Sequence, residues 1–387
     1  MDEVDIAIIG AGIAGSSAAI VLARRGWRTV VIDRQRFPRH KVCGEFLSPE
    51  ALTMLAELGV LERIYDRGPG IIRQAALTLH GQEELRLALP AAALGISRYF
   101  LDSALHRQAS DDGARIVTGT TVSAVRSQGD GYTIDTRGSE CGGFRARAVI
   151  SACGSAPGRD LPGGALRDPA GGRLRYLGVK SHYSGMTSGD AVELYFWKGG
   201  YVGLAPVEDG IVNVAGLLAH TSAVRERGSV LELLEWACRN NPQLQRRLSG
   251  AEPVSGTQAA VSPVPLGKPL TAWQGAALTG DAAIVIPPLC GDGMSIALRT
   301  SLLCAAQADA FLSGRISKDI WQRSYEKTVK RQLSRPLRWG RVMQQSLSHP
   351  ALAPFLAQLA RTAPRLASQF VKATRLDPHP SGGGLYG

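Results

Sequence analysis

A glycine-rich turn between a short apolar segment and a helical segment lies almost at the N-terminus, and it constrains the fold more than any other feature. Val4–Ile9 is short and rich in β-branched residues, which is typical of a strand buried on both faces. Ser16–Arg25 then carries Ala and Leu at helical spacing. The order of strand, glycine turn and helix predicts a unit that binds a dinucleotide.

Each glycine of this turn has its own role in such a unit. Gly10 allows the tight turn, Gly12 lets the backbone approach a pyrophosphate, and Gly15 lets the helix pack closely on the strand. The N-terminus of the helix then faces the phosphates. Asp33 ends a second predicted strand, where a carboxylate accepts hydrogen bonds from a ribose 2′-hydroxyl and repels a 2′-phosphate.

The composition is that of an ordinary globular protein. The 387 residues are 44% hydrophobic and 20% charged, which predicts two or three domains or one large composite domain. The apolar runs are too short for a membrane span, and a strand so near the N-terminus leaves no room for a signal peptide, so we expect a cytoplasmic protein. The six cysteines show neither metal-ligand spacing nor a disulfide framework, so we expect reduced thiols and no metal site.

The net charge of +11 favours anionic partners or cofactors. Most basic residues are spread along the chain, but one segment concentrates them, namely Lys327, Lys330, Arg331, Arg335, Arg338 and Arg341. Because no nucleic-acid motif accompanies this segment, we expect no nucleic-acid partner. Two interpretations of Lys327–Arg341 stay open, a solvated helix face and a face that docks a carrier protein or a membrane surface.

Other segments have clear periodicity. Pro49–Leu58 predicts a helix, because Ser48 is a good N-cap and Gly59 follows its end. Leu77–His80 and Leu85–Leu89 alternate between two faces and predict a hairpin. We further expect helices over Arg98–Ser110, Val230–Arg239 and Gly293–Leu312, a helical region to about Ala373 and a loose tail over Asp377–Gly387.

A second glycine-containing turn precedes the predicted helix that starts near Gly293. A predicted buried strand ends in Gly280-Asp281, and Pro288–Gly293 then opens the helix. The amides of Gly291 and Gly293 would point at a neighbouring anion or polarised oxygen. Two such helix N-termini suit a long cofactor that has phosphates at one end and a reactive ring at the other.

The order of these motifs resembles the para-hydroxybenzoate hydroxylase-like flavoproteins, and within them the geranylgeranyl reductase and flavin monooxygenase branch. The motifs that carry the resemblance are the glycine triplet, Cys43-Gly44 with Leu47-Ser48-Pro49, Arg98, Tyr201-Val202-Gly203-Leu204-Ala205-Pro206, Gly280-Asp281 and Pro288–Gly293. Together they extend over nearly the whole chain.

The resemblance implies FAD as the bound dinucleotide and an α/β (α+β composite) fold. In that fold an antiparallel β-sheet substrate domain is inserted in two pieces into a Rossmann-type FAD-binding domain, and helices follow. The expected FAD-binding domain comprises residues 1–70, 96–165 and 270–318, the substrate domain residues 71–95 and 166–269, and the C-terminal helical region and tail residues 319–387.

On the same resemblance, both turns and the segments beside them hold the cofactor. The expected cofactor-binding residues are Gly10, Gly12, Ala14, Gly15, Asp33, Arg34, Lys41, Arg98, Val122, Gly280, Asp281, Gly291, Gly293 and Met294. NADH or NADPH is the candidate electron donor, although Cys153-Gly154 stands where related monooxygenases carry an Asp-Gly pair associated with pyridine nucleotides.

Cys43 is the predicted catalytic residue. The resemblance implies that its loop lies beside the flavin ring and the substrate, where Cys43 would donate a proton. Lys41 or His40 would supply the positive charge that favours a thiolate. The alternative is that Cys43 only fills a tight loop beside the ring.

Several aromatic residues on adjacent predicted strands would wall an apolar pocket. The expected substrate-pocket residues are Tyr183, Tyr195, Trp197, Tyr201 and Pro288. The alternative is that the aromatic residues form the core of the sheet. The expected substrate is a small apolar molecule, free or bound to a carrier protein, and peripheral contact with a membrane stays open.

We therefore predict an FAD-dependent monooxygenase of secondary metabolism that hydroxylates or epoxidises an apolar aromatic or polyketide-like substrate through a flavin hydroperoxide. Such an enzyme needs no side-chain nucleophile, because the cofactor carries the chemistry. The main alternative is a reductase or dehydrogenase that acts on carbon–carbon double bonds, which the Cys43-Gly44 loop favours. Lesser alternatives are a flavin halogenase, although Tyr201–Pro206 lacks the tryptophans of the halogenase motif, and a flavin-binding docking protein without turnover.

Overall fold

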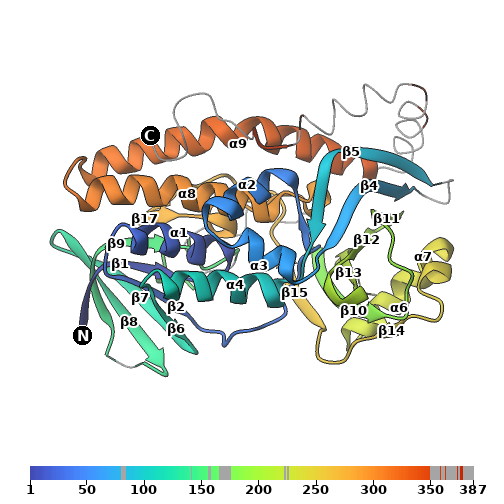
Figure 1. The fold of residues 1–387 in the computed structure, drawn as a ribbon, viewed down its shortest axis with the longest axis horizontal. Helices are drawn as coiled ribbons and strands as arrows, with labels where there is room; N and C mark the ends of the chain where they lie inside the picture. The colour runs from blue at the N-terminus through green and yellow to red at the C-terminus, as the bar shows by residue number, and fades with distance from the viewer. Residues whose placement is uncertain are drawn as a thin grey trace.

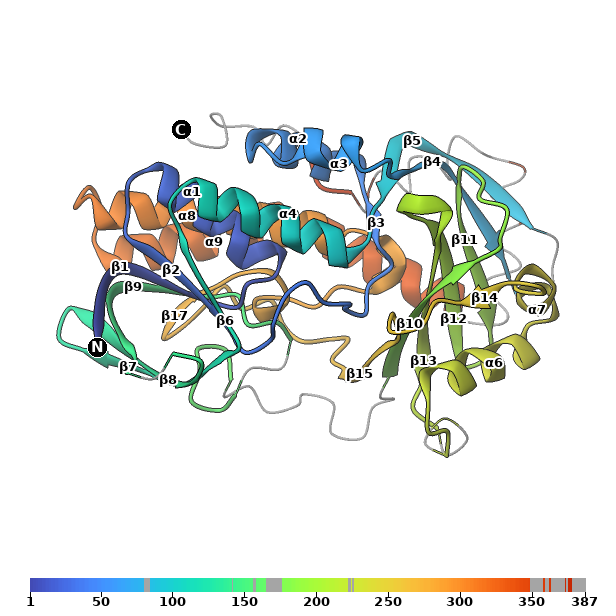
Figure 2. The ribbon, with the colours of Figure 1, turned by 60° about the horizontal axis from the view of Figure 1, so that its bottom comes forward.

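The structure is a computed structural model, and it describes residues 1–79, 84–140, 142–155, 158–164, 176–221, 224, 226–348, 358, 362, 373 and 375–377. Two β-sheets lie at opposite ends of the molecule, and helices cover one face of the first sheet (Figure 1). In a turned view the two sheets stand apart, with helices and connecting segments between them (Figure 2). This arrangement confirms the predicted α/β composite fold.

The first sheet is built around parallel strands. Its strands are β1 (Asp2–Ile9), β2 (Thr29–Asp33), β6 (Arg115–Thr118), β7 (Thr120–Gln128), β8 (Gly131–Gly138), β9 (Phe144–Ser151), β16 (Trp273–Gln274) and β17 (Ala276–Leu278). The order is β16-β17-β9-β1-β2-β6, and β8 joins β7 to β9 in antiparallel pairs. β1 pairs in parallel with β2 and β9, so the turn after β1 lies at the centre of the sheet's carboxyl edge.

Helices α1 (Ile13–Arg24), α4 (Arg98–Asp111) and α8 (Gly293–Leu312) pack together over this sheet. Two shorter helices, α2 (Pro49–Glu57) and α3 (Leu61–Asp66), lie beside them. α1 is buried along almost its whole length because small and aliphatic residues occupy every side of it. The same core includes Ile6 and Ile8 of β1, so the sheet and its helices share one hydrophobic cluster.

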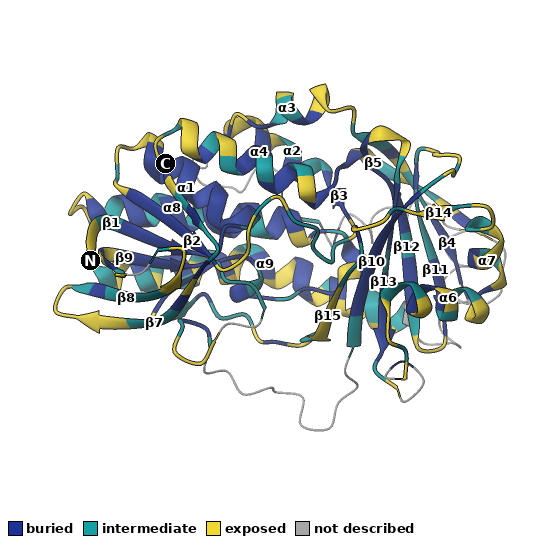
Figure 3. Cartoon of the chain, turned by 90° about the horizontal axis from the view of Figure 1, so that it is seen from below, coloured by how far each residue is buried: buried dark blue, intermediate teal, exposed yellow. Residues whose placement is uncertain are grey.

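The second sheet is mostly antiparallel. Its strands are β3 (Phe46–Leu47), β4 (Gly70–Thr78), β5 (Leu85–Gly95), β10 (Tyr176–Ser184), β11 (Ala191–Trp197), β12 (Gly200–Pro206), β13 (Val212–Ala219), β14 (Glu252–Pro253) and β15 (Ala259–Val264). The order is β14-β10-β13-β12-β11-β4-β5-β3, with β15 beside β10. Helices α6 (Val230–Asn240) and α7 (Pro242–Arg247) cover its outer face. The centres of both sheets are buried (Figure 3).

A long helix, α9 (Lys318–Ser348), packs on α8. One row of its side chains is buried at a spacing of four residues, namely Trp321, Tyr325, Val329, Leu333 and Leu337. This row follows one side of a helix, so the opposite side of α9 faces away from the core.

The predicted helices over residues 49–58, 98–110, 230–239 and 293–312 correspond to α2, α4, α6 and α8. The two alternating segments form the antiparallel pair β4–β5, and residues 80–83 between them lie outside the described residues. Most of the predicted helical region after residue 348 and most of the tail also lie outside the described part of the chain. Residues 1–70 contribute to both sheets, because β3 pairs with β5.

Candidate active site

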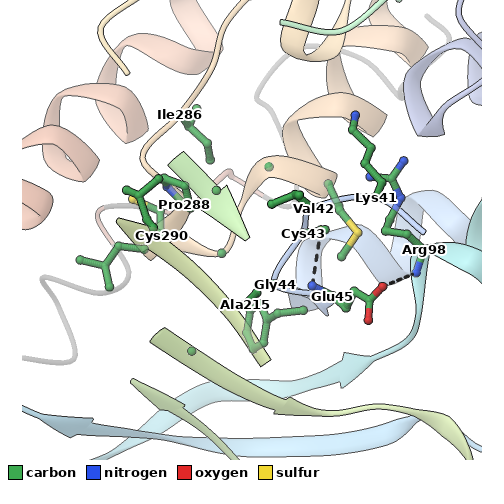
Figure 4. A pocket seen from close by; sticks show the side chains of 18 of the residues that line it. Lys41, Val42, Cys43, Gly44, Glu45, Arg98, Ala215, Ile286, Pro288 and Cys290 are labelled. Carbon is green, nitrogen blue, oxygen red and sulfur yellow. Dashed lines mark hydrogen bonds between the residues drawn. The ribbon is translucent and has the colours of Figure 1, made fainter. Parts of the chain in front are cut away.

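A cavity of about 860 Å³ lies between the two sheets. Its walls come from the turn after β1, from the loop that follows β2, from the inner face of the second sheet and from the segment before α8. Figure 4 shows Cys43 and Glu45 of the loop on one side, and Pro288 and Cys290 on the other. A cavity of this size can bury most of a small-molecule ligand, which makes it the candidate active site.

The turn after β1 leaves open space in front of Gly12. A Cβ atom at Gly10 would lie 2.3 Å from the carbonyl oxygen of Ala152, and one at Gly15 would lie 1.8 Å from that of Gly10. A Cβ atom at Gly12 would come no closer than 3.6 Å to a neighbour, the Arg98 guanidinium. The fold itself therefore requires Gly10 and Gly15, whereas Gly12 leaves room for a pyrophosphate at the N-terminus of α1.

Asp33 ends β2 beside this turn and lines the cavity. Its Oδ2 accepts a hydrogen bond from the amide of Ala11 and its Oδ1 one from the amide of Gln35, both at 2.8 Å. The two amides fix the carboxylate at the cavity wall. Its remaining lone pairs can accept hydrogen bonds from ribose hydroxyls.

Lys41 and Asp281 meet across the cavity wall, although they come from distant parts of the sequence. The Lys41 Nζ lies 3.6 Å from the Asp281 Oδ2, and both side chains are partly exposed. Arg34 lines the same cavity. These groups place polar and charged atoms along the path between the two helix N-termini, where the hydroxyls of a long cofactor would need partners.

Arg98 is a buried cation at the start of α4. Its guanidinium donates two hydrogen bonds to Asp102, at 2.9 and 2.8 Å. Burial by itself would lower the pKa of Arg98, but Asp102, and Cys43 in its thiolate form, raise that pKa by more. Arg98 therefore stays charged, close to both Gly12 and Cys43.

The turn before α8 opens onto the cavity at Gly293. Gly291 has a φ of +71°, and a Cβ atom there would lie 2.9 Å from the ring of Phe46. A Cβ atom at Gly293 would have no neighbour within 4 Å. Asp292 between them is buried and lies 2.6 Å from Arg375. Burial raises the pKa of Asp292 to about 7, although Arg375 opposes the shift.

The structure brings most of the expected cofactor-binding residues to one cavity. Those in its wall are Gly12, Ala14, Asp33, Arg34, Lys41, Arg98, Gly280, Asp281, Gly291, Gly293 and Met294. Gly10 and Gly15 shape the turn behind this wall. Val122 lies outside this wall, because its side chain packs with Val117 and Ile134 in the core of the first sheet.

The expected aromatic wall also needs correction. Tyr201 and Pro288 line the cavity. Three other aromatic residues are buried against α6 and α7 on the opposite face of the second sheet, namely Tyr183, Tyr195 and Trp197. Side chains alternate along a strand, so Val192 and Leu194 of β11 face the cavity while the odd-numbered positions of that strand face α6 and α7.

The cavity face of the second sheet is apolar, and small residues hollow its centre. On β12, Tyr201, Gly203 and Ala205 line the cavity, while Val202 and Leu204 pack on the other face. The apolar residues around this hollow include Leu77, Leu87, Leu89, Val192, Leu194, Val261, Val264, Leu289 and Met343.

Sequence reasoning missed a buried charge cluster at Glu45. This residue has a left-handed backbone, with a φ of 55°, and a fully buried side chain. Its Oε1 accepts hydrogen bonds from the Lys180 Nζ at 2.6 Å and from the Arg98 amide at 2.8 Å. Its Oε2 lies 2.6 Å from the His182 Nε2. The cluster ties the loop after β2 to β10 of the second sheet.

His40 extends this cluster toward the surface. Its Nδ1 lies 3.3 Å from the Lys180 Nζ, and its ring stacks on Tyr99. Burial and the charge of Lys180 lower the pKa of His40 to about 4, so the ring is neutral at pH 7. A sequence signal existed: Lys180 and His182 lie two positions apart, so they share one face of a buried strand.

Cys43 lies in the cavity wall, where the loop after β2 meets the second sheet. The Glu45 amide donates a hydrogen bond to its Sγ at 3.4 Å, and the Asn213 side chain donates one to its carbonyl oxygen at 3.0 Å. These contacts hold the loop in place from both sides.

Within the described residues, no group of three or more His, Cys, Asp and Glu side chains is placed to hold a metal ion. The helices of that same part of the chain are too short or too polar to cross a membrane.

Comparisons with known proteins agree with this geometry. Residues 3–155 match the family described as FAD binding domain. The menaquinone reductase of Mycobacterium tuberculosis is 29% identical over 338 residues, which cover 80% of this chain and 77% of the relative. Digeranylgeranylglycerophospholipid reductase 3 of Methanosphaera stadtmanae is 25% identical over 346 residues, or 81% and 79% of the two chains.

A solved structure of a flavin-dependent brominase shares the fold, with a TM-score of 0.79 and 18% identity, and the match covers 96% of this chain and 93% of that one. The segment that matches the FAD binding domain contains Gly12, Asp33 and Arg98, and all three line the cavity. The space in front of Gly12 also fits the pyrophosphate of FAD. Residues 3–155 therefore form an FAD-binding domain, and the cavity that they help to line is the FAD site.

Proposed function

We propose that this flavoprotein reduces carbon–carbon double bonds of an apolar substrate, with NADH or NADPH as electron donor. The observation that carries the proposal is the position of Cys43, between the FAD-binding turns and the apolar face of the second sheet. The two relatives described above, which match 80% and 81% of this chain, are named as reductases, and this favours reduction over oxygenation. The hypothesis that the protein is a monooxygenase stays a prediction.

Residues of both turns would hold FAD along the cavity. The N-terminus of α1 at Gly12 would bind the pyrophosphate, and Asp33 would accept hydrogen bonds from a ribose. The N-terminus of α8 at Gly293 would lie beside the ring, and its amides would stabilise negative charge there. When bound and reduced, FAD supplies the electron pair that reduction of a double bond needs.

The apolar wall would bind the substrate and exclude water. Aliphatic side chains from β4, β5, β11 and β15 surround the hollow over Gly203 and Ala205. Burying an apolar chain on such a surface is favourable by about 25 cal/mol per Å². The wall offers few polar groups, so it selects apolar substrates by burial rather than by hydrogen bonds.

Cys43 would hold the proton that one carbon of the double bond receives. The S–H bond of Cys43 would break as the proton moves to the carbon atom, while the electron pair comes from the reduced cofactor. Asn213 and the Glu45 amide keep the loop in register with the cavity. The thiol thus has a fixed position, which proton donation in the transition state requires.

Replacing Cys43 with alanine tests this proposal. We expect turnover to fall about 100-fold, because a positioned proton donor contributes on that scale, while the FAD content stays unchanged. The assay incubates the holoenzyme and NADPH with a polyprenyl quinone under anaerobic conditions and follows the gain of hydrogen by mass spectrometry. Cys238→Ala on α6, whose side chain packs outside the cavity, is the matched control.

Equal turnover in the Cys43→Ala and Cys238→Ala variants would show that Cys43 does not donate the proton. If product forms only in air and oxygen is consumed in proportion, the reaction is a hydroxylation or epoxidation, and the proposed reduction is wrong.

A leucine at Gly293 is expected to slow the reduction of bound FAD about tenfold while leaving FAD bound, which corresponds to about 1.4 kcal/mol of barrier. The side chain fits the protein, because a Cβ atom at Gly293 has no neighbour within 4 Å, but it enters the space of the ring. Stopped-flow reduction and the FAD-to-protein ratio separate the two effects. A wild-type reduction rate would contradict the placement of the ring at α8.

A further inference from the structure

The outward side of α9 carries a row of basic residues, here called the α9 basic face. Its members are Lys327, Lys330, Arg331, Arg335, Arg338 and Arg341, and all of them are exposed. Residues 327–348 contain no acidic residue. The face follows the helix over residues 327–341, which is about 21 Å at 1.5 Å per residue. Figure 1 shows α9 along the edge of the molecule, beyond α8.

The charges of the α9 basic face are not neutralised within the described part of the protein, where no salt bridge joins them to a carboxylate. Other arginines near the surface of the molecule have such partners. The partly exposed Arg63 lies 3.0 Å from Asp111, and the exposed Arg126 lies 2.5 Å from Asp135. The six positive charges of this face therefore amount to more than half of the net charge of +11.

Two further features of α9 indicate what the face meets. Ile320, about two helical turns before Lys327, and Val342, directly after Arg341, are exposed by 47% and 40%. Beyond the face, Met343 and Ser346 of the same helix line the cavity. A basic row flanked by aliphatic side chains, on a helix that also borders an apolar cavity, suits a surface that is anionic outside and apolar beneath.

We propose that the α9 basic face binds the surface of an anionic lipid bilayer, from which an apolar substrate reaches the cavity past the C-terminal end of α9. Rows of Lys and Arg bind anionic lipid surfaces by charge, and the attraction decays within a Debye length. The face binds the headgroups of many lipids together and requires no partner with a matching fold. Entry of the substrate rests on the proposed function, whereas binding of the bilayer rests on the charge alone.

Flotation with vesicles tests the proposal on the intact holoenzyme. The probes are vesicles of phosphatidylcholine alone and vesicles with about 30% phosphatidylglycerol, each at about 50 mM and about 500 mM NaCl. We expect the wild type to float with the anionic vesicles at low salt and to be released at high salt. Flotation with the neutral vesicles should be weak under both conditions.

A triple variant, Arg331→Gln, Arg335→Gln and Arg338→Gln, is expected to lose at least about tenfold in affinity for the anionic vesicles. The matched control, Arg126→Gln, Arg137→Gln and Arg145→Gln, removes the same charge from exposed positions of the first sheet and should lose less than about twofold. Thermal melts and FAD content of both variants report whether the fold is kept. The salt dependence of the wild type tests the proposal even if a variant fails to fold.

Equal losses in the two triple variants, or equal binding of the wild type to both kinds of vesicle, would overturn the proposal. So would a triple variant that keeps its vesicle binding but loses binding to an isolated acidic acyl carrier protein, because a protein would then be the partner. Vesicle binding is measured without turnover, so its failure leaves the Cys43 test untouched, and failure of that test leaves the membrane result standing.

Discussion

Replacing Gly12 with valine is expected to raise the Kd for FAD about 1000-fold, or by about 4 kcal/mol, and to leave the fold intact. The protein tolerates a Cβ atom at Gly12, since its nearest neighbour would be the Arg98 guanidinium at 3.6 Å. The branched side chain instead occupies the space that a pyrophosphate needs at the N-terminus of α1. Flavin absorbance of the purified variant and titration of the apoprotein with FAD measure the loss.

Gly228→Val is the matched control, because Gly228 is exposed and an added Cβ atom there has no neighbour within 4 Å. This variant should keep the FAD content of the wild type. A variant at Gly10 does not serve, since the Cβ atom would lie 2.3 Å from the Ala152 carbonyl oxygen and disturb the fold itself. Undiminished FAD in Gly12→Val would contradict the assignment of the turn.

Replacing Glu45 with glutamine is expected to lower the free energy of unfolding by about 3 to 5 kcal/mol at pH 7. The substitution leaves the fully buried Lys180 ammonium without the carboxylate that lies 2.6 Å from it. An unpaired buried charge is costly because the protein interior solvates it poorly. Urea denaturation of the holoenzyme at several pH values measures the effect.

The contribution of Glu45 to the free energy of unfolding is expected to fall as the pH is lowered. Burial would raise the pKa of Glu45, but hydrogen bonding to His182 and the charge of Lys180 lower it below its ordinary value of 4.5. The ionised carboxylate therefore stabilises the folded protein at pH values above 4.5, and this contribution is lost as the pH falls through the lowered pKa. The Glu45→Gln variant should lack this acid-dependent loss. The free energies of unfolding of the wild type and the variant should therefore approach each other in acid.

Two further variants separate the buried charge from other causes. Asp111→Asn breaks an exposed ion pair with Arg63 and should cost no more than about 1 kcal/mol. In the double variant Glu45→Gln with Lys180→Met, the buried ammonium is gone as well, so much of the lost stability should return. A double variant that is less stable than Glu45→Gln would show that the cost has another origin.

The FAD-binding turn could be predicted because its parts are close in sequence. Strand β1, the turn and helix α1 lie between Asp2 and Arg24, and Asp33 follows at the end of the next strand. The geometry of such a unit depends mainly on local backbone conformation, which glycine positions and apolar periodicity report. The α8 turn could be predicted for the same reason, from Gly291 and Gly293.

The substrate side of the cavity could not be predicted to the same extent. Side chains alternate with a period of two, and that pattern indicates two faces of a strand without indicating which face lies on the cavity. When both faces are buried, apolar residues occupy both. Tyr201 therefore lines the cavity, whereas Tyr195 of the adjacent strand packs with α6 and α7.

By itself, the sequence determined the dinucleotide-binding unit, the order of the main helices and the place of Cys43 in the loop after Asp33, because short-range spacing encodes each of them. The tertiary structure alone decided that Glu45 meets Lys180 and His182, which lie 135 and 137 positions away. It also decided that, within the described part of the chain, no carboxylate lies within salt-bridge distance of the basic residues of α9. Contacts between distant segments depend on how the sheets and helices pack, and no local pattern of residues records that packing.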